Sequence, residues 1–108
     1  MSDHTSWLSQ QRALYQRKLS AWNRAKSVFG YDAVQYRQDA HGSWIAWSEY
    51  GQHTQYGWEI DHELPKAHFP GVVNHPGNLR ALHWRNNRAK SDKLDLSTIV
   101  RLLGGVQS

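Results

Sequence analysis

Six tryptophans in a chain of 108 residues are the feature that most limits how this protein can fold. They are Trp7, Trp22, Trp44, Trp47, Trp58 and Trp84. A chain of this length buries only about 60–70% of the surface that its unfolded form exposes, so it can build one small core. Each large aromatic side chain can bury roughly 150–250 Å² there. We therefore expect a single domain whose core contains most of these rings, Trp44 and Trp47 included, with base stacking as the alternative role for that pair.

The sequence contains no cysteine, which excludes a disulfide framework and a thiolate zinc site. Stability must then come from packing, or from a metal held by oxygen and nitrogen atoms. No run of eighteen or more apolar residues occurs, and residues 1–12 lack the basic and apolar regions of a secretory signal. We expect a cytoplasmic protein with no membrane partner.

The positive charge of the chain is concentrated in residues 80–93. This segment has five basic residues against one acidic residue, so its net charge equals the +4 of the whole chain. The basic residues are Arg80, Arg85, Arg88, Lys90 and Lys93. Such a stripe favours contact with a polyanion such as nucleic acid, although a solvated helix face remains open as the simpler interpretation.

The N-terminal region has the pattern of a helix. Its apolar residues recur every seven positions, at Leu8, Tyr15, Trp22 and Phe29. Thr5 or Ser6 can cap the start and Gly30 can end it, as one long helix or as two helices broken near Ser20. We expect the apolar stripe to pack on the rest of the fold; a helix that binds a partner is the alternative.

Two runs typical of strands follow, over residues 43–50 and 57–62, and together they predict a loose hairpin. Between Leu64 and Asn78 lie three prolines and two glycines, which predict an irregular loop. Residues 78–82 then predict a short strand, and residues 83–93 a helix without a breaker.

The last segment, residues 95–105, predicts a short helix that ends at Gly104. The residues 31–41 are polar and ambiguous, with a helical turn as one interpretation. The expected fold class is therefore α+β. We divide the chain into an N-terminal helical extension over residues 1–42 and a core over residues 43–108, within one domain overall.

Polar side chains stand where these elements can meet. Asp61 ends the strand predicted over residues 57–62, and Asn87 lies inside the helix predicted over residues 83–93. If that helix folds back across the strands, the carboxylate and the amide oxygen can hold one hard divalent cation that keeps several waters. His83, four residues before Asn87, is a further ligand candidate by spacing, although a partly buried structural histidine is the stronger interpretation.

His62 follows Asp61 directly and should point to the opposite face of the strand. Its imidazole is then free to act as a base, because a histidine with an ordinary pKa of about 6.5 can take a proton from water at neutral pH. A metal on the other side of a phosphorus atom can stabilise the charge of the transition state. Together these groups indicate phosphodiester hydrolysis.

This set of residues resembles the HNH endonuclease motif, which forms the ββα-metal finger, also called the His-Me finger. The motif comprises Asp61-His62 with Pro65, Asn78-Leu79, and the run NRAKSD that begins at Asn87. The chain is similar to the subclass in which asparagine replaces the last histidine, as in the HNH domain of RNA-guided CRISPR nucleases. There, as here, the last asparagine stands nine positions after the middle one. The resemblance covers Gly57 to Lys93, about a third of the chain.

The resemblance implies an α+β fold with a ββα-metal core and an enzyme that cuts nucleic acid, with DNA preferred. It implies that Asp61 and Asn87 bind the metal, that His62 is the general base, and that Asn78 braces the loop or orients His62. Mg²⁺ or Mn²⁺ is the expected metal, with Zn²⁺ or Ni²⁺ as alternatives. By charge and position, we assign the nucleic-acid contacts to Arg80, Arg85, Arg88, Lys90 and Lys93.

Two departures from the family pattern matter. Many relatives carry two CxxC pairs that bind a structural zinc, whereas His83 and Asn86 stand at the corresponding helix positions here. The loop has Pro70-Gly71 and Pro76-Gly77 in place of the usual Gly-Gly pair. We therefore expect no structural zinc.

Two other functions remain open. The same finger can bind nucleic acid without cutting it, or the N-terminal helix can be the active part of a protein that binds a partner. Because one finger supplies one active site, a clean double-strand break implies a homodimer or two successive nicks. A larger phage or mobile-element complex is a further alternative.

Overall fold

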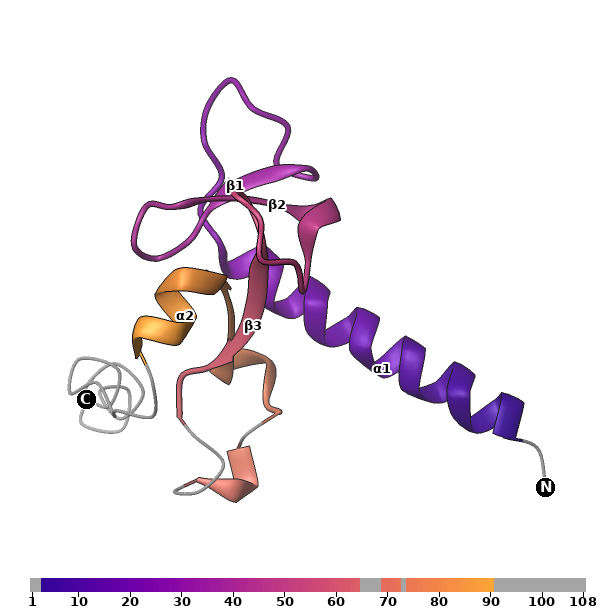
Figure 1. Ribbon diagram of the computed structural model, residues 1–108. Helices are drawn as coiled ribbons and strands as arrows, with labels where there is room; N and C mark the ends of the chain where they lie inside the picture. The colour runs from indigo at the N-terminus through magenta and orange to yellow at the C-terminus, as the bar shows by residue number, and fades with distance from the viewer. Residues whose placement is uncertain (1–2, 65–68, 73, 91–108) are drawn as a thin grey trace.

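The computed structural model describes residues 3–64, 69–72 and 74–90, and it has the expected α+β class (Figure 1). Two helices and two small antiparallel sheets make up this part of the chain. In chain order the elements are α1 (Asp3–Arg24), β1 (Tyr36–Gln38), β2 (Trp44–Ala46), β3 (Trp58–His62), β4 (Leu79–His83) and α2 (Trp84–Lys90). Strand β1 pairs with β2, and β3 pairs with β4.

Helix α1 is one continuous helix of 22 residues that ends at Arg24. Of the two alternatives, one long helix is confirmed and a break near Ser20 is excluded, whereas the expected end at Gly30 is wrong. The chain leaves the helix because Lys26 pairs with Gln38: the amide of each donates to the carbonyl of the other, at 2.8 and 2.9 Å. Gly30 instead lies in a turn with a φ of 89°, a conformation that favours glycine.

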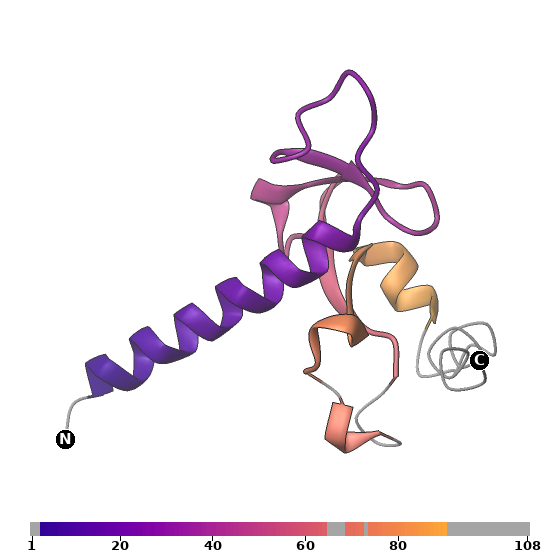
Figure 2. The ribbon, with the colours of Figure 1, turned by 180° about the vertical axis from the view of Figure 1, so that it is seen from behind.

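The apolar stripe of the N-terminal region is only partly buried. Trp22 lies in the core, but Leu8 and Tyr15 are 44% and 52% exposed, and Phe29 lies beyond the helix and is fully exposed. Figure 2 shows the first half of α1 extending away from the rest of the protein. The expectation that the stripe packs on the rest of the fold is thus confirmed for Trp22 and for Tyr15, whose ring contacts that of Trp47, and is wrong for Leu8 and Phe29. In the described part of the chain, no helix is both long and apolar enough to cross a membrane.

Three of the six tryptophans meet in the core. The ring of Trp22 lies 5.2 Å from that of Trp58 and 5.6 Å from that of Trp47, measured between centroids. The ammonium of Lys18 covers this cluster, 4.6 Å from the Trp47 ring and 4.6 Å from the Tyr50 ring. Burial against these rings lowers the pKa of Lys18.

The loose hairpin expected between residues 43–50 and 57–62 does not form. Strand β2 pairs with β1, which lies in the polar segment 31–41, and β3 pairs with β4. The run after β2 turns into a short 3₁₀ helix, Trp47–Glu49, and Gly51 follows with a φ of 74°. After this bend, the chain at Tyr50 runs parallel to the start of β3. The two segments are joined by an isolated bridge between Tyr50 and Trp58.

The expected order of strand, loop, strand and helix in the second half is confirmed by β3, β4 and α2. The helix expected over residues 95–105 lies outside the described residues. Helix α1 covers one face of the β3–β4 pair, where Trp22 packs on Trp58 and Leu79, and α2 lies on the other face (Figures 1 and 2). The boundary that we placed between residues 42 and 43 falls between β1 and β2. These two strands pair, so the N-terminal extension and the core both contribute to one sheet.

Candidate functional site

The last residues of β3 present different side chains to the two helices. The antiparallel register places Asp61 opposite Arg80, and His62 opposite Leu79, which is buried beneath α1. Because side chains alternate along a strand, Asp61 faces α2 and His62 faces the other side of the sheet. Asp61 is 6% exposed and His62 is half-buried.

The carboxylate of Asp61 is surrounded by positive charge. Its Oδ2 atom accepts a hydrogen bond from Nε of Arg80 at 2.8 Å. The ammonium of Lys90 donates to Oδ1 at 2.8 Å, to Oδ2 at 2.9 Å and to the carbonyl oxygen of His62 at 3.1 Å. A buried carboxylate needs such partners, since an unpaired charge in this environment is strongly unfavourable. Three oxygen atoms thus converge on one cationic group.

Asn87 lies on the face of α2 that is turned toward β3, three residues before Lys90. Its Nδ2 atom donates to Oε1 of Glu59 at 2.8 Å, and Arg88 donates to Oε2 of the same carboxylate at 3.2 Å. The amide oxygen of Asn87 accepts no hydrogen bond from any residue that the structure describes. Asp61 and Asn87 therefore lie on facing elements, but their direct partners are Lys90 and Glu59.

Glu59 was not among the expected site residues, although strand alternation could have found it. It stands two residues before Asp61 and so shares its face of β3. Burial acts to raise the pKa of Glu59, but hydrogen bonds from Asn87 and Arg88, with the charges of Arg88 and His53, outweigh it. The net effect lowers the pKa of Glu59 below the ordinary 4.5, so the carboxylate stays ionised beside Asn87.

The ring of His62 makes no hydrogen bond with the described residues, but the backbone beyond it is firmly held. Asn78 accepts from the amide of Leu64 at 2.7 Å through Oδ1 and donates to its carbonyl oxygen at 3.1 Å through Nδ2. The amide of Glu63 donates to the carbonyl oxygen of Asn78 at 3.0 Å. Asn78, 3% exposed, thus contacts the backbone of the loop.

Arg24, the last residue of α1, holds both ends of the same loop, and no local signal in the sequence indicates this. Its guanidinium donates to the carbonyl oxygens of Gly77 and Leu79 at 2.8 and 2.7 Å. It also forms an ion pair with Glu63, which is 3% exposed. These contacts join residues 39 to 55 positions apart in the chain.

The basic residues that were predicted to contact nucleic acid differ in whether they already form ion pairs. Arg80 and Lys90 are paired with Asp61, and Arg88 with Glu59. The guanidinium of Arg85 is exposed, lies 5.1 Å from the Trp84 ring centroid, and makes no ion pair with the described residues. Lys93 lies outside the described residues, as do Pro65 and Ser91.

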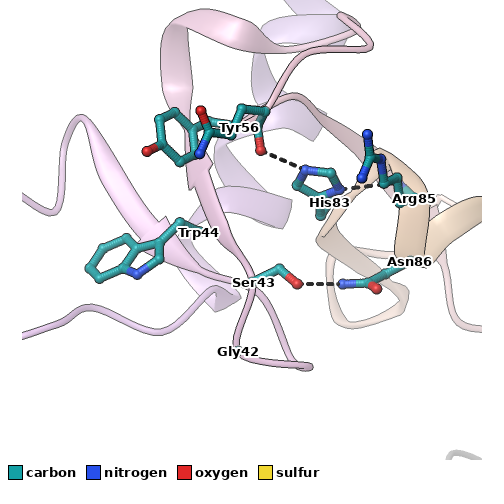
Figure 3. Close-up of a pocket in the computed structure, with 8 residues that line it drawn as sticks. Gly42, Ser43, Trp44, Tyr56, His83, Arg85 and Asn86 are labelled. Atoms are coloured by element: carbon teal, nitrogen blue, oxygen red, sulfur yellow. Dashed lines mark hydrogen bonds between the residues drawn. The ribbon is translucent and has the colours of Figure 1, made fainter.

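His83 has a structural role in the fold. Its Nδ1 atom accepts from the amide of Arg85 at 3.1 Å, so Nε2 carries the proton and donates to the carbonyl oxygen of Gln55 at 2.8 Å (Figure 3). Both ring nitrogens are thereby used by the backbone. Within residues 3–64, 69–72 and 74–90, no three histidine, aspartate or glutamate side chains gather to hold a metal. A site formed by Asp61 and Asn87 would be of a different kind, because it would offer one carboxylate and one amide.

Comparisons of the chain with protein-family models, with curated proteins and with solved structures found no match. Three groups are available for chemistry at the end of β3. They are the buried carboxylate of Asp61, which is paired with Arg80 and Lys90, the amide oxygen of Asn87 on the facing helix, and the ring of His62 on the opposite face of the strand.

Proposed function

We propose that this protein is a metal-dependent endonuclease of the HNH type, which hydrolyses phosphodiester bonds in nucleic acid, with DNA as the preferred substrate. The observation that carries the proposal is the group of three oxygens around the Lys90 ammonium. The ring of His62, on the opposite face of β3, has no hydrogen-bond partner among the described residues and supports it. The order β3, loop, β4 and α2 supports it, because a ββα-metal finger has the same order of elements.

The residues present fit an oxygen-bound divalent cation. The Lys90 ammonium marks a position where both oxygens of Asp61 and the carbonyl oxygen of His62 already bind a positive group, at 2.8 to 3.1 Å. The amide oxygen of Asn87 is a further donor on the facing helix. Such hard donors suit Mg²⁺ or Mn²⁺, whereas Zn²⁺ sites are usually built from nitrogen and sulfur. Asp61 and Asn87 would hold the ion.

When bound, the cation stabilises negative charge that develops on the phosphate and on the leaving oxygen. His62 takes the proton from the attacking water, a step for which a positioned base typically contributes about 10²- to 10⁴-fold in rate. Asn78 and Arg24 hold the loop that begins beside His62, and so fix the position of its backbone. Lys90, once separated from Asp61, would be free to bind a phosphate oxygen.

Cleavage of supercoiled plasmid with Mg²⁺ or Mn²⁺ tests this proposal. We expect nicked or linear product from the unaltered protein and a rate at least about 100-fold lower for His62→Ala. His41→Ala is the matched control, since this histidine is exposed and lies in the turn between β1 and β2. Activity that survives His62→Ala, in protein free of contaminating nuclease, would exclude His62 as the base.

A second candidate function is a module that binds nucleic acid without cutting it. The double pairing of Asp61 with Arg80 and Lys90 favours this candidate, since the carboxylate is already neutralised. Such a module would bind DNA with an affinity that falls steeply with salt and would show no cleavage with any divalent ion. The plasmid assay therefore separates the two candidates.

A further inference from the structure

Two adjoining pockets lie on the side of the protein where β2 faces the start of α2. The first, which we call the aromatic pocket, has a volume of about 310 Å³ and is lined by Tyr31, Tyr36, Trp44 and Tyr56. The second, the polar pocket, has a volume of about 380 Å³ and shares Trp44 and Tyr56 with the first. Its other lining residues are Gly42, Ser43, Gln55, His83, Arg85 and Asn86. Both volumes fall within the range of small-molecule sites, roughly 300–1,000 Å³.

The aromatic pocket consists of rings that the core does not use. Tyr31, Tyr36 and Tyr56 are 57%, 42% and 37% exposed. The Tyr31 ring lies 4.7 Å from that of Trp44, and the two planes are inclined at 53°. Trp44 therefore belongs to a surface cluster, and its expected place in the core is wrong. A concentration of exposed aromatic surface in a small domain indicates a site of interaction.

The polar pocket adds fixed polar groups to these rings. The Nδ2 atom of Asn86 donates to Oγ of Ser43 at 2.9 Å (Figure 3). It also donates to Oδ2 of Asp39 at 2.8 Å, and the two bonds set the orientation of the amide. The oxygen of this amide accepts no hydrogen bond from the described part of the chain. The pocket thus offers a hydrogen-bond acceptor in a fixed position beside Trp44.

Arg85 supplies the charge. Figure 3 shows Arg85 and Asn86 on one side of the polar pocket, with the rings of Trp44 and Tyr56 on the other. Arg80, Arg88 and Lys90 are each paired with a carboxylate, whereas Arg85 makes no ion pair with any described residue. Its exposed guanidinium can therefore bind a phosphate without breaking an ion pair.

We propose that these pockets bind one unpaired nucleotide of single-stranded nucleic acid, with its base against the rings of Trp44 and Tyr56 and its phosphate on Arg85. Aromatic rings beside a basic group are the usual means of binding single strands. A quaternary ammonium ligand also fits a cage of aromatic rings. However, no acidic residue lines either pocket in the described structure, and Arg85 would repel a cation.

This inference rests on the proposed function, from which it takes nucleic acid as the class of ligand. It adds to that function the kind of nucleic acid that is bound. Arg85 lies five residues before Lys90, or about 8 Å along the axis of α2. Because five residues also turn the helix by about 140°, a strand held at Arg85 would pass around α2 to reach the end of β3. The candidate nuclease site would then act on nucleic acid that contains unpaired nucleotides, such as a single strand, a flap or a junction.

Binding without metal tests the inference, because cleavage then plays no part in the result. We would measure the affinity of the full chain for a fluorescent 15-nucleotide oligothymidine and for a 15-base-pair duplex, with EDTA present. Tyr56→Ala and Trp44→Ala should each weaken binding of the single strand about tenfold and leave duplex binding within about twofold. Arg85→Ala should also lower the salt dependence by about one phosphate contact. Trp7→Ala is the matched control, since this ring is 54% exposed but lies on α1.

Photochemical crosslinking of the unaltered protein covers the case in which a variant fails to fold. A strand that contains 5-bromouracil should crosslink to a peptide containing Tyr31, Tyr36, Trp44 or Tyr56. Crosslinks confined to other peptides, or equal losses of single-strand and duplex binding in the pocket variants, would overturn the inference. Binding of tetramethylammonium in place of the oligonucleotide would also overturn it. Single-strand binding that persists while no metal supports cleavage would instead contradict only the proposed function.

Discussion

The ammonium of Lys90 lies 2.8 and 2.9 Å from the two carboxylate oxygens of Asp61, and it thereby joins the last turn of α2 to the end of β3. This contact has two consequences. It neutralises a carboxylate that is only 6% exposed, and it occupies the oxygens that a divalent ion would use. Metal binding and the Lys90 contact should therefore compete for Asp61.

Replacement of Lys90 by methionine should tighten metal binding. The substitution keeps an unbranched side chain of similar length but removes the competing charge. We expect the Kd for Mn²⁺ to fall about tenfold, which corresponds to about 1.4 kcal/mol. Calorimetric titration of the protein with Mn²⁺ measures this change, with Lys26→Met, on an exposed lysine, as the control. Unchanged or weaker Mn²⁺ binding in Lys90→Met would contradict competition at Asp61.

Glu59 should make the stability of the protein depend on pH in the acid range. Burial acts to raise its pKa, but hydrogen bonds from Asn87 and Arg88 lower it more, so the folded-state pKa lies below the ordinary 4.5. The ionised group thus stabilises the folded state above about pH 4.5, and this contribution is lost as the pH falls through the lowered pKa. In urea unfolding between pH 6 and pH 3, Glu59→Gln should lose less stability than the unaltered protein. Equal losses in the two proteins would show that Glu59 has no such role.

Arg24 should be needed for stability although it lies at the end of a helix. Its replacement by methionine removes the ion pair with Glu63 and the hydrogen bonds to Gly77 and Leu79, and should lower the free energy of unfolding by about 2–4 kcal/mol. Arg12→Met, at an exposed position of α1, should change it by less than about 0.5 kcal/mol. Urea unfolding of the two variants gives the comparison. A loss below about 1 kcal/mol for Arg24→Met would mean that the loop is held by other contacts.

Asp39 should be the main link between the β1–β2 turn and the start of α2. Its Oδ1 atom accepts from the amides of His41 and Ser43, each at 2.9 Å, and its Oδ2 atom accepts from the amide of His83 and from Asn86, at 2.9 and 2.8 Å. Because Asp39 is 2% exposed, alanine at this position leaves buried donors without an acceptor.

For Asp39→Ala we expect a loss of about 3 kcal/mol or more in the free energy of unfolding. Asp32→Ala is the matched control, because Asp32 makes one turn contact with the amide of Val34 at 2.9 Å but is exposed. The free energy of unfolding of Asp32→Ala should fall by about 1 kcal/mol or less. Similar losses in both variants would show that burial of Asp39 adds little.

The elements around the site could be predicted from sequence because their signals are local. Alternation in β3 and β4 and an unbroken helical segment after them place Asp61, His62 and Asn87 on the correct elements. The partner of β2 could not be found in this way. Strand β1 depends on pairing with both Lys26 and Ala46, and the bend that separates β2 from β3 depends on packing around Trp58.

The contacts that hold the site are long-range, and this explains which of its residues were missed. Arg24 meets Glu63 across 39 positions in the chain, and no periodicity or motif indicates such a pair. Glu59 had a usable signal, its shared strand face with Asp61, but the binding of Asn87 to Glu59 depends on the position of α2. The convergence of Asp61 and Asn87 on one ion remains a prediction, since Lys90 and Glu59 are their direct partners in this structure.

The most direct test of the central claim is a plasmid cleavage assay in which Mn²⁺ binding is measured on the same samples. The unaltered protein should cut only when a divalent metal is present. His62→Ala should bind Mn²⁺ with unchanged affinity and cut at least about 100-fold more slowly, whereas Asn87→Ala should lose both binding and cleavage. No cleavage by the unaltered protein with any divalent metal, or full cleavage by His62→Ala, would contradict the proposed nuclease.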